Sequence, residues 1–146
     1  MEIQIQNRRK HSLIKTRQIL RTTKILLNAL GRPDAELSIL VVDDGEIAEI
    51  NRQYLGRTGP TNVISFPMNE GGFDDINPDL LGDVVISVDT AQREAADAGI
   101  GITDRFDDLL IHGILHLLGY DHETGEEDER IMAEKNAWLK DCLAKN

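Results

Sequence analysis

The sequence predicts an α/β (α+β) fold in which a small mixed four-stranded sheet is covered by about five helices. Two observations support this prediction. Short apolar segments of strand length alternate with longer segments in which apolar residues recur at helical spacing. The 146 residues, of which 40% are hydrophobic and 29% charged, are typical of one globular domain, and no repeat or Pro/Gly/Ser-rich linker divides them. We therefore expect a single domain over residues 1–146.

Four segments have the length and residue types of strands. Residues 3–5 alternate apolar and polar side chains, as a half-buried strand does, whereas residues 37–42 and 83–88 are apolar runs that suit more buried strands. Residues 62–66, followed by Pro67, form the fourth. Residues 71–79 are rich in Gly, Asp, Asn and Pro and predict a long loop.

Helical patterns separate and follow these strands, in the order β-α-β-α-β-β-α-α-α. Helices are expected near residues 13–30, 45–54, 90–98, 104–118 and 125–143. Asp89 with Gln92, and Thr124 with Glu127, have the spacing of a capping box, in which two side chains satisfy free amides of the first turn. In the last helix, Trp138 falls at helical spacing with Leu139 and Leu143, which is typical of a core position.

Several classes of protein are excluded by simple features of the chain. No apolar run approaches the ~20 residues that span a bilayer, so a membrane protein is excluded. The N-terminus lacks the basic and then apolar layout of a signal peptide, and the one cysteine, Cys142, has no partner for an intramolecular disulfide. We therefore expect a cytoplasmic protein.

The charge is distributed unevenly along the chain. The net charge is −10, but residues 1–32 contain eight Lys and Arg residues against one acidic residue and so carry +7, whereas the rest carries −17. A basic N-terminal helix would give one surface an affinity for an anionic partner such as RNA, with Arg17 and Arg21 as candidate contacts. The alternative is that its basic residues pair with acidic neighbours.

Three of the four histidines lie within eleven residues, as His112, His116 and His122. Positions i and i+4 share one side of a helix, so His112 and His116 can present two imidazole nitrogens to one ion. Gly119 can end that helix and turn the chain so that His122 approaches from a third direction. Three neutral nitrogens around one ion leave a fourth position for water, as in catalytic Zn²⁺ sites, although Ni²⁺ also accepts three imidazoles.

Two alternatives to a catalytic nuclease site remain open at this point. A closed structural site would result if Asp121, Glu123 or Glu126 supplied a fourth ligand. The spacing of the histidines also matches that of metzincin proteases, but the position of their general-base glutamate is occupied here by Gly113. The absence of that carboxylate disfavours peptide hydrolysis, and phosphodiester cleavage depends less on it.

Three sequence blocks together resemble a known family. Residues 112–122 (HGILHLLGYDH), 60–66 (PTNVISF) and 81–86 (LGDVVI) are similar to blocks of the bacterial YbeY family of metal-dependent endoribonucleases, in the same order. The resemblance implies a single-strand-specific endoribonuclease that binds one Zn²⁺ through the three histidines. It further implies a role in maturing the 3′ end of small-subunit 16S rRNA and in ribosome quality control, with the rRNA precursor and the ribosomal small subunit as partners.

One position departs from the family pattern. Many relatives have an arginine directly after the tyrosine that precedes the Pro-Thr-Asn block, whereas this chain has Leu55 after Tyr54. Arg57 follows two residues later, and glycines flank it closely in the segment LGRTG. We hypothesise that Arg57 takes the catalytic role of that arginine, because a guanidinium fork suits a phosphate. The alternative is a solvated loop arginine.

Several polar residues have both a structural and a functional interpretation. Asp121 either hydrogen-bonds a ligand histidine or caps the neighbouring turn. Thr61, Asn62 and Ser65 either line the cleft, with Asn62 contacting substrate, or form the turn that enters a strand. Asp83 belongs either to the start of a strand or to the cleft wall.

The functional prediction is a zinc-dependent endoribonuclease acting on rRNA precursors. Two other classes stay open. A metzincin-like metalloprotease would cleave a denatured protein in a His116-dependent manner. A non-catalytic ribosome-assembly adaptor, in which the metal stabilises the fold, would unfold when the metal is removed.

Overall fold

Four strands form one mixed sheet in the computed structural model, which describes residues 2–9, 14–68, 79–120 and 125–146. Their order across the sheet is β1 (Ile3–Asn7), β2 (Glu36–Val42), β4 (Leu80–Ser87) and β3 (Val63–Pro67). The first three run parallel to one another, and β3 pairs antiparallel with β4 at the edge. In this register Val84 lies opposite Ser65, so both side chains lie on the same side of the sheet.

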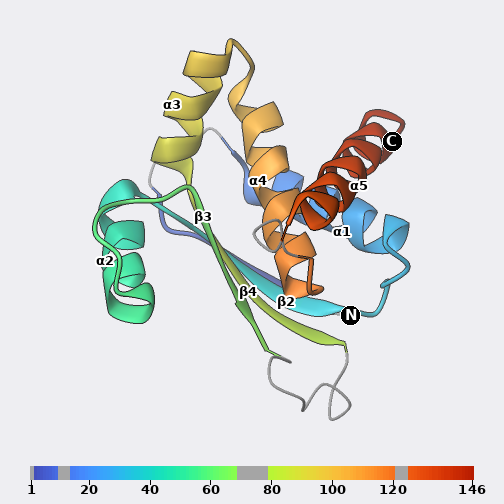
Figure 1. Ribbon diagram of the computed structural model, residues 1–146, viewed down its shortest axis with the longest axis horizontal. Helices are drawn as coiled ribbons and strands as arrows, with labels where there is room; N and C mark the ends of the chain where they lie inside the picture. The colour runs from blue at the N-terminus through green and yellow to red at the C-terminus, as the bar shows by residue number, and fades with distance from the viewer. Residues whose placement is uncertain (1, 10–13, 69–78, 121–124) are drawn as a thin grey trace.

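Helices cover the two faces of the sheet unequally (Figure 1). They are α1 (Thr16–Ala29), α2 (Asp44–Leu55), α3 (Val88–Ala98), α4 (Ile102–Leu117) and α5 (Glu126–Ala144). On one face α2 packs over a small cluster that contains Ile47, Ile64 and Val85. On the opposite face α1, α4 and α5 contribute to a much larger core, in which α4 adjoins β3 and β4.

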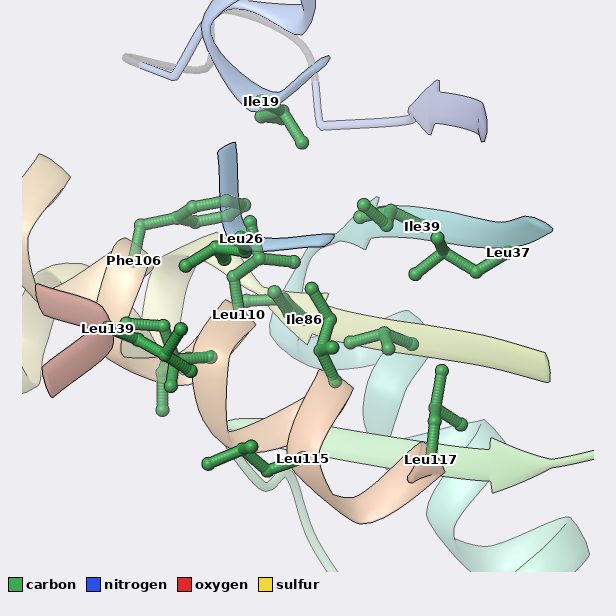
Figure 2. Close-up of a cluster of buried hydrophobic side chains, with 14 of the residues drawn as sticks. Ile19, Leu26, Leu37, Ile39, Ile86, Phe106, Leu110, Leu115, Leu117 and Leu139 are labelled. Carbon is green, nitrogen blue, oxygen red and sulfur yellow. The ribbon is translucent and has the colours of Figure 1, made fainter. Parts of the chain in front are cut away.

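The larger core is built from one apolar side of each helix and alternate residues of the strands. Figure 2 shows Leu26 of α1, Phe106 and Leu110 of α4, and Leu139 of α5 packed toward Ile39 and Ile86 of the sheet. These side chains are at most 1% exposed, and burying each one stabilises the fold by about 1.5–3 kcal/mol. The apolar periodicity of the sequence therefore determines which side of α4 turns inward, and thus which side remains for a site.

The structure confirms the predicted fold class and the order of its elements. The sheet is mixed and four-stranded, and the five helices of the described residues coincide with the predicted ranges to within about three residues at each end. None of these helices is long and apolar enough to cross a bilayer. The predicted loop at residues 71–79 lies almost entirely outside the described residues, as does Thr124.

The predicted cap of α3 was wrong. Ser87 caps this helix, because its hydroxyl oxygen accepts a hydrogen bond from the Thr90 amide at 3.3 Å. Asp89 lies within the first turn and accepts hydrogen bonds from Arg9 and from the Asp44 amide instead. The sequence pattern did not show that a serine two residues earlier already ends the strand.

The predicted core position of Trp138 was also wrong. Its side chain is 43% exposed, whereas the adjacent Leu139 is fully buried and Leu143 packs against the core. The inward side of α5 is therefore narrow, and Trp138 lies just outside it.

Candidate metal centre

Helix α4 brings two of the three predicted ligands together. His112 and His116 are half-buried on the side of α4 that the core leaves free, one turn apart. Their Nε2 atoms lie 2.9 Å apart, with ring centroids at 4.5 Å and ring planes at 67°. The two rings thus direct the same nitrogen toward one point, as the i, i+4 spacing predicted.

The chemistry of this donor pair fits a divalent cation. Two nitrogens bound to one tetrahedral zinc ion lie about 3.3 Å apart, from bonds of about 2.0–2.1 Å, and the observed separation is close to that value. Imidazole nitrogens are also the ligands that zinc and nickel accept most readily. The geometry of His112 and His116 therefore fits half of a metal site without rearrangement of α4.

The third predicted ligand lies outside the described residues. His122 belongs to residues 121–124, together with Asp121, Glu123 and Thr124. Among the residues that are described, no group of three or more His, Cys, Asp or Glu side chains is placed to hold a metal ion. Glu126, which is described and exposed at the start of α5, therefore does not complete such a group with His112 and His116.

The turn that leads toward His122 is well defined. Gly119 has φ +96°, and its amide donates to the His116 carbonyl at 3.0 Å. The Tyr120 amide donates to the Leu115 carbonyl at 3.0 Å, which completes a Schellman motif. Gly119 therefore ends α4 directly after the second histidine, as predicted.

Gly113 allows α4 to approach the sheet closely beside the histidines. A Cβ at this position would lie 2.6 Å from Val84 Cγ1 and 3.3 Å from Ser65 Oγ. The Ser65 hydroxyl donates to the Gly113 carbonyl at 2.9 Å, so the same contact is reinforced by a hydrogen bond. The metzincin glutamate position is thus pressed against β3 and β4 and has no space for a carboxylate, which further disfavours a protease.

The polar residue Asn62 of the 60–66 block makes hydrogen bonds that hold the start of β3 and join it to α3. The Asn62 Oδ1 atom accepts from the Val63 amide at 2.7 Å, and its Nδ2 atom donates to Glu94 of α3 at 3.2 Å. Glu94 in turn pairs with Arg105 of α4 at 3.0 Å. These contacts favour the interpretation of Asn62 as the entry to a strand, and Thr61, which precedes it, is half-buried.

Asp83 lies on the other face of the sheet. It pairs across β4 with Phe66 and Ser38, whose side chains share the face covered by α2, and its carboxylate accepts from the Ser38 hydroxyl. Val84, the next residue, is the one that meets α4. Asp83 is therefore not part of a cleft wall beside His112.

Arg57 is exposed in the segment that follows α2. Its amide donates to the Asn51 carbonyl at 3.3 Å and closes the C-terminus of α2. Within the described residues its guanidinium makes no hydrogen bond or ion pair, and it does not contact His112 or His116. The structure thus leaves this guanidinium available without bringing it to the histidines.

Sequence reasoning missed a charged network on α4 one turn before His112. Asp108 contacts Lys140 of α5 at 3.1 Å and Arg105 at 3.9 Å. Burial raises the pKa of the neighbouring Asp107 to about 6, with the nearby Lys140 acting in the opposite direction. The i, i+3 spacing of Arg105 and Asp108 was visible in the sequence, but Lys140 comes from α5 and could not be assigned from spacing.

The basic N-terminal region divides into paired and unpaired residues. Arg8 pairs with Glu46 at 2.5 Å and Arg9 with Asp89 at 2.8 Å. Arg17 and Lys24 are exposed on α1 and have no ion pair within the described residues. Pairing with acidic neighbours thus accounts for Arg8 and Arg9, which precede α1, whereas it does not account for Arg17 and Lys24.

A cavity of about 420 Å³ lies at the carboxyl ends of β2 and β4, away from the histidines. It is lined by Arg9, Asp44, Asp89, Gln92, Arg93 and Ala96. Its arginines are paired with its own carboxylates, Arg9 with Asp89 and Arg93 with Asp44 at 2.6 Å. Burial raises the pKa of Asp44, but hydrogen bonds from Arg93, Thr90 and Ser87 outweigh it and lower that pKa. The two arginines and two carboxylates leave the cavity balanced in charge.

Comparisons with known proteins show the family to which the chain is similar. The family model described as Endoribonuclease YbeY matches residues 4–142. The Endoribonuclease YbeY of Geobacter sulfurreducens is 52% identical over 136 residues, which cover 92% of this chain and 91% of that protein. The protein of the same description from Aquifex aeolicus is 41% identical over 138 residues, covering 93% and 89%.

A solved structure has the same fold. The solution structure of TM1509 from Thermotoga maritima superimposes with a TM-score of 0.70 at 25% identity, covering 98% of this chain and 90% of that one. The arrangement of sheet and helices described above is thus found in an experimentally determined relative.

Proposed function

The chain belongs to the YbeY family of endoribonucleases, and from this membership we propose that its catalytic centre is one divalent metal ion held by His112, His116 and His122. The observation that carries the proposal is the convergence of the His112 and His116 Nε2 atoms, 2.9 Å apart, on the half-buried side of α4. The Schellman turn at Gly119 supports it, because this turn directs the chain away from the helix axis just before His122.

The residues of the chain have distinct roles in this proposal. When bound, a Zn²⁺ ion supplies Lewis acidity at the scissile phosphate. The imidazoles hold the ion, and the hydrogen bond from Ser65 to the Gly113 carbonyl holds the helix that carries them. Arg57 binds a substrate phosphate through its guanidinium, which its loop carries to the site when RNA is present.

The substrate in this proposal is single-stranded rRNA precursor, with cleavage contributing to 3′ end maturation of 16S rRNA on the ribosomal small subunit. The exposed cations Arg17 and Lys24 of α1 support an RNA substrate, since they are not neutralised by carboxylates of the described residues. A cytoplasmic location belongs to the same proposal.

The test of the metal centre is cleavage of end-labelled single-stranded rRNA by the wild type and by His116→Ala. We expect His116→Ala to fold, as judged by circular dichroism, and to lose cleavage. His11→Ala, which changes the one histidine outside the motif, is the matched control and should cut like the wild type. Equal cleavage by His116→Ala would identify a contaminating nuclease, and no cleavage by a metal-loaded wild type would favour an assembly adaptor.

Arg57 is tested separately with Arg57→Ala. We expect weaker RNA binding and slower cleavage, because one charge-assisted contact to phosphate is lost. Arg52→Ala is the matched control, since Arg52 lies on the same helix end and is already paired with Glu49. Unchanged cleavage and affinity in Arg57→Ala would show that Arg57 is a solvated loop residue.

A further inference from the structure

Three side chains from two segments form an aromatic and cationic cluster beside the end of α4. The Lys135 Nζ atom lies 5.0 Å from the ring centroid of Trp138 and 6.0 Å from that of Tyr120. Trp138 is 43% exposed, and Ile131, one turn before Lys135, is 37% exposed. We call Tyr120, Lys135 and Trp138 the α5 aromatic cluster.

Lys135 differs from the other cations of α5 in how its charge is balanced. Arg130 pairs with Glu127 and Glu134, and Lys145 pairs with Asp141 at 3.3 Å. Lys140 pairs with Asp108 at 3.1 Å. Lys135 has no carboxylate partner within the described residues and contacts only ring faces. Its ammonium group is therefore available to an anion.

The position of the cluster relates it to the metal centre. Tyr120 follows His116 by four residues, and its amide closes the Schellman turn that ends α4. Tyr120 also packs against the main core, so the cluster is anchored to the same helix end that precedes His122. A strand of RNA that reaches the histidines along this side would pass the cluster.

We propose that the α5 aromatic cluster is a nucleotide-binding subsite for single-stranded RNA, in which a base stacks on Trp138 and Lys135 contacts the adjoining phosphate. An exposed indole offers a π face to any unpaired base, and an unpaired ammonium offers the matching charge for phosphate. The faces of bases in a duplex are already stacked, so the subsite selects single strands. The inference rests on the proposed cleavage of single-stranded RNA.

The direct test uses the fluorescence of the chain's single tryptophan, which is Trp138. Titration of the metal-loaded protein with a single-stranded 12-nucleotide RNA is expected to quench this fluorescence, because stacking places a base against the indole. The same RNA annealed to its complement is expected to quench weakly. Equal quenching by both RNAs, or none by either, overturns the subsite.

Affinity measurements on variants give a second readout. Trp138→Ala is expected to weaken binding of the labelled single strand by about 5-fold or more, since stacking on one aromatic side chain is worth about 1–3 kcal/mol. Trp138→Phe should retain most of the affinity, and Lys135→Ala should reduce both the affinity and its salt dependence. Ile100→Ala is the matched control, because Ile100 is 41% exposed and lies just before α4, at the opposite end of that helix from Tyr120. Equal affinity of Trp138→Ala and the wild type overturns the proposal.

The two proposals fail in different ways. If His116-dependent cleavage is observed but Trp138→Ala raises neither the dissociation constant nor KM, only the subsite is wrong. If single strands quench Trp138 while no metal-dependent cleavage occurs, the subsite stands and the proposed catalytic centre fails. A concentration-dependent change in the mass of the wild type that Trp138→Ala abolishes would overturn the subsite and identify a second copy as the occupant of this surface.

Discussion

At Gly113 the absence of a side chain determines how closely α4 approaches the sheet. Glycine in a helix interior costs about 1 kcal/mol relative to alanine, so this residue weakens α4 locally. The close packing of α4 on the sheet compensates for this cost. It requires glycine, since Val84 and Ser65 occupy the space that a Cβ would need. Gly113, the residue after the first histidine, thus allows close packing. A metzincin has a glutamate at this position, and its Cβ would clash with Val84 here.

Gly113→Ala is expected to lower the free energy of unfolding by about 1 kcal/mol, because overpacking of ~1–3 kcal/mol outweighs the gain in helix propensity. The contact at 2.6 Å is with Val84 Cγ1, so the loss should be smaller on a Val84→Ala background. Urea denaturation of the two single variants and the double variant measures this coupling. Equal losses on both backgrounds would show that the clash with Val84 is not the cause.

Asp107 predicts a pH dependence of stability. Burial raises its pKa to about 6 from 3.8, so the ionised form is disfavoured in the folded chain. Between about pH 6 and pH 4 the folded chain retains a proton that the unfolded chain has released, and stability contributed by this group therefore rises as the pH falls. At pH 7 the penalty is present in full, on the order of 1–2 kcal/mol once screening by solvent is allowed for.

Asp107→Asn is accordingly expected to raise the free energy of unfolding at pH 7 and to make little difference near pH 4. Denaturant unfolding at the two pH values measures the effect. Asp97→Asn, at an exposed position of α3, controls for the loss of one negative charge from the molecule. A gain for Asp107→Asn that is the same at both pH values would contradict this assignment.

At the scale of the element, α4 and α1 each combine a core side with a side that carries residues of the proposed function. In α4 the apolar side, from Phe106 to Leu117, was predictable from periodicity, and so was the convergence of His112 and His116 at i and i+4. In the basic N-terminal region the sequence identified the cations but did not show which are paired. Arg8 and Arg9, which precede α1, pair with Glu46 of α2 and Asp89 of α3, which are distant in sequence.

The unpaired cations of α1 should contribute most to the salt dependence of RNA binding. Each phosphate contact on a single strand adds about 0.7 to the slope of log affinity against log salt concentration. Arg17→Gln with Lys24→Gln is therefore expected to reduce that slope by about 1.4, measured by fluorescence anisotropy. Arg8→Gln with Arg52→Gln removes the same charge from paired positions and should change it less. Equal changes in the two double variants would show that α1 is not the RNA surface.

At the scale of the molecule, the sequence predicted the fold well because the apolar pattern and the helix-ending glycines act locally. It predicted less where partners come from several elements. Ser87 replaced Asp89 as a cap, Asp83 proved to lie on the α2 face, and Trp138 lies outside the core. These outcomes depend on where β4 passes into α3, on which sheet face α2 covers and on how α5 packs, and periodicity along one segment specifies none of these.

The extent of the core also bears on what the metal does for the whole chain. The main core joins α1, α4, α5 and the sheet without using the histidines, and a chain of this size does not need a metal to fold. We therefore expect the metal-free protein to keep its far-UV circular dichroism, with Zn²⁺ at 100 times its dissociation constant adding about 2.7 kcal/mol. That gain corresponds to a rise in Tm of about 5–10 °C.

His116→Ala should lose this rise in Tm, and His11→Ala should retain it. Thermal unfolding with Zn²⁺ and with a chelator measures both variants beside the wild type. Since the proposed centre holds one ion, the stabilisation should saturate at one ion per chain. Loss of the folded state on chelation alone would contradict the open catalytic site and favour a closed structural one. In a structural site the free energy of metal binding is part of the free energy of folding.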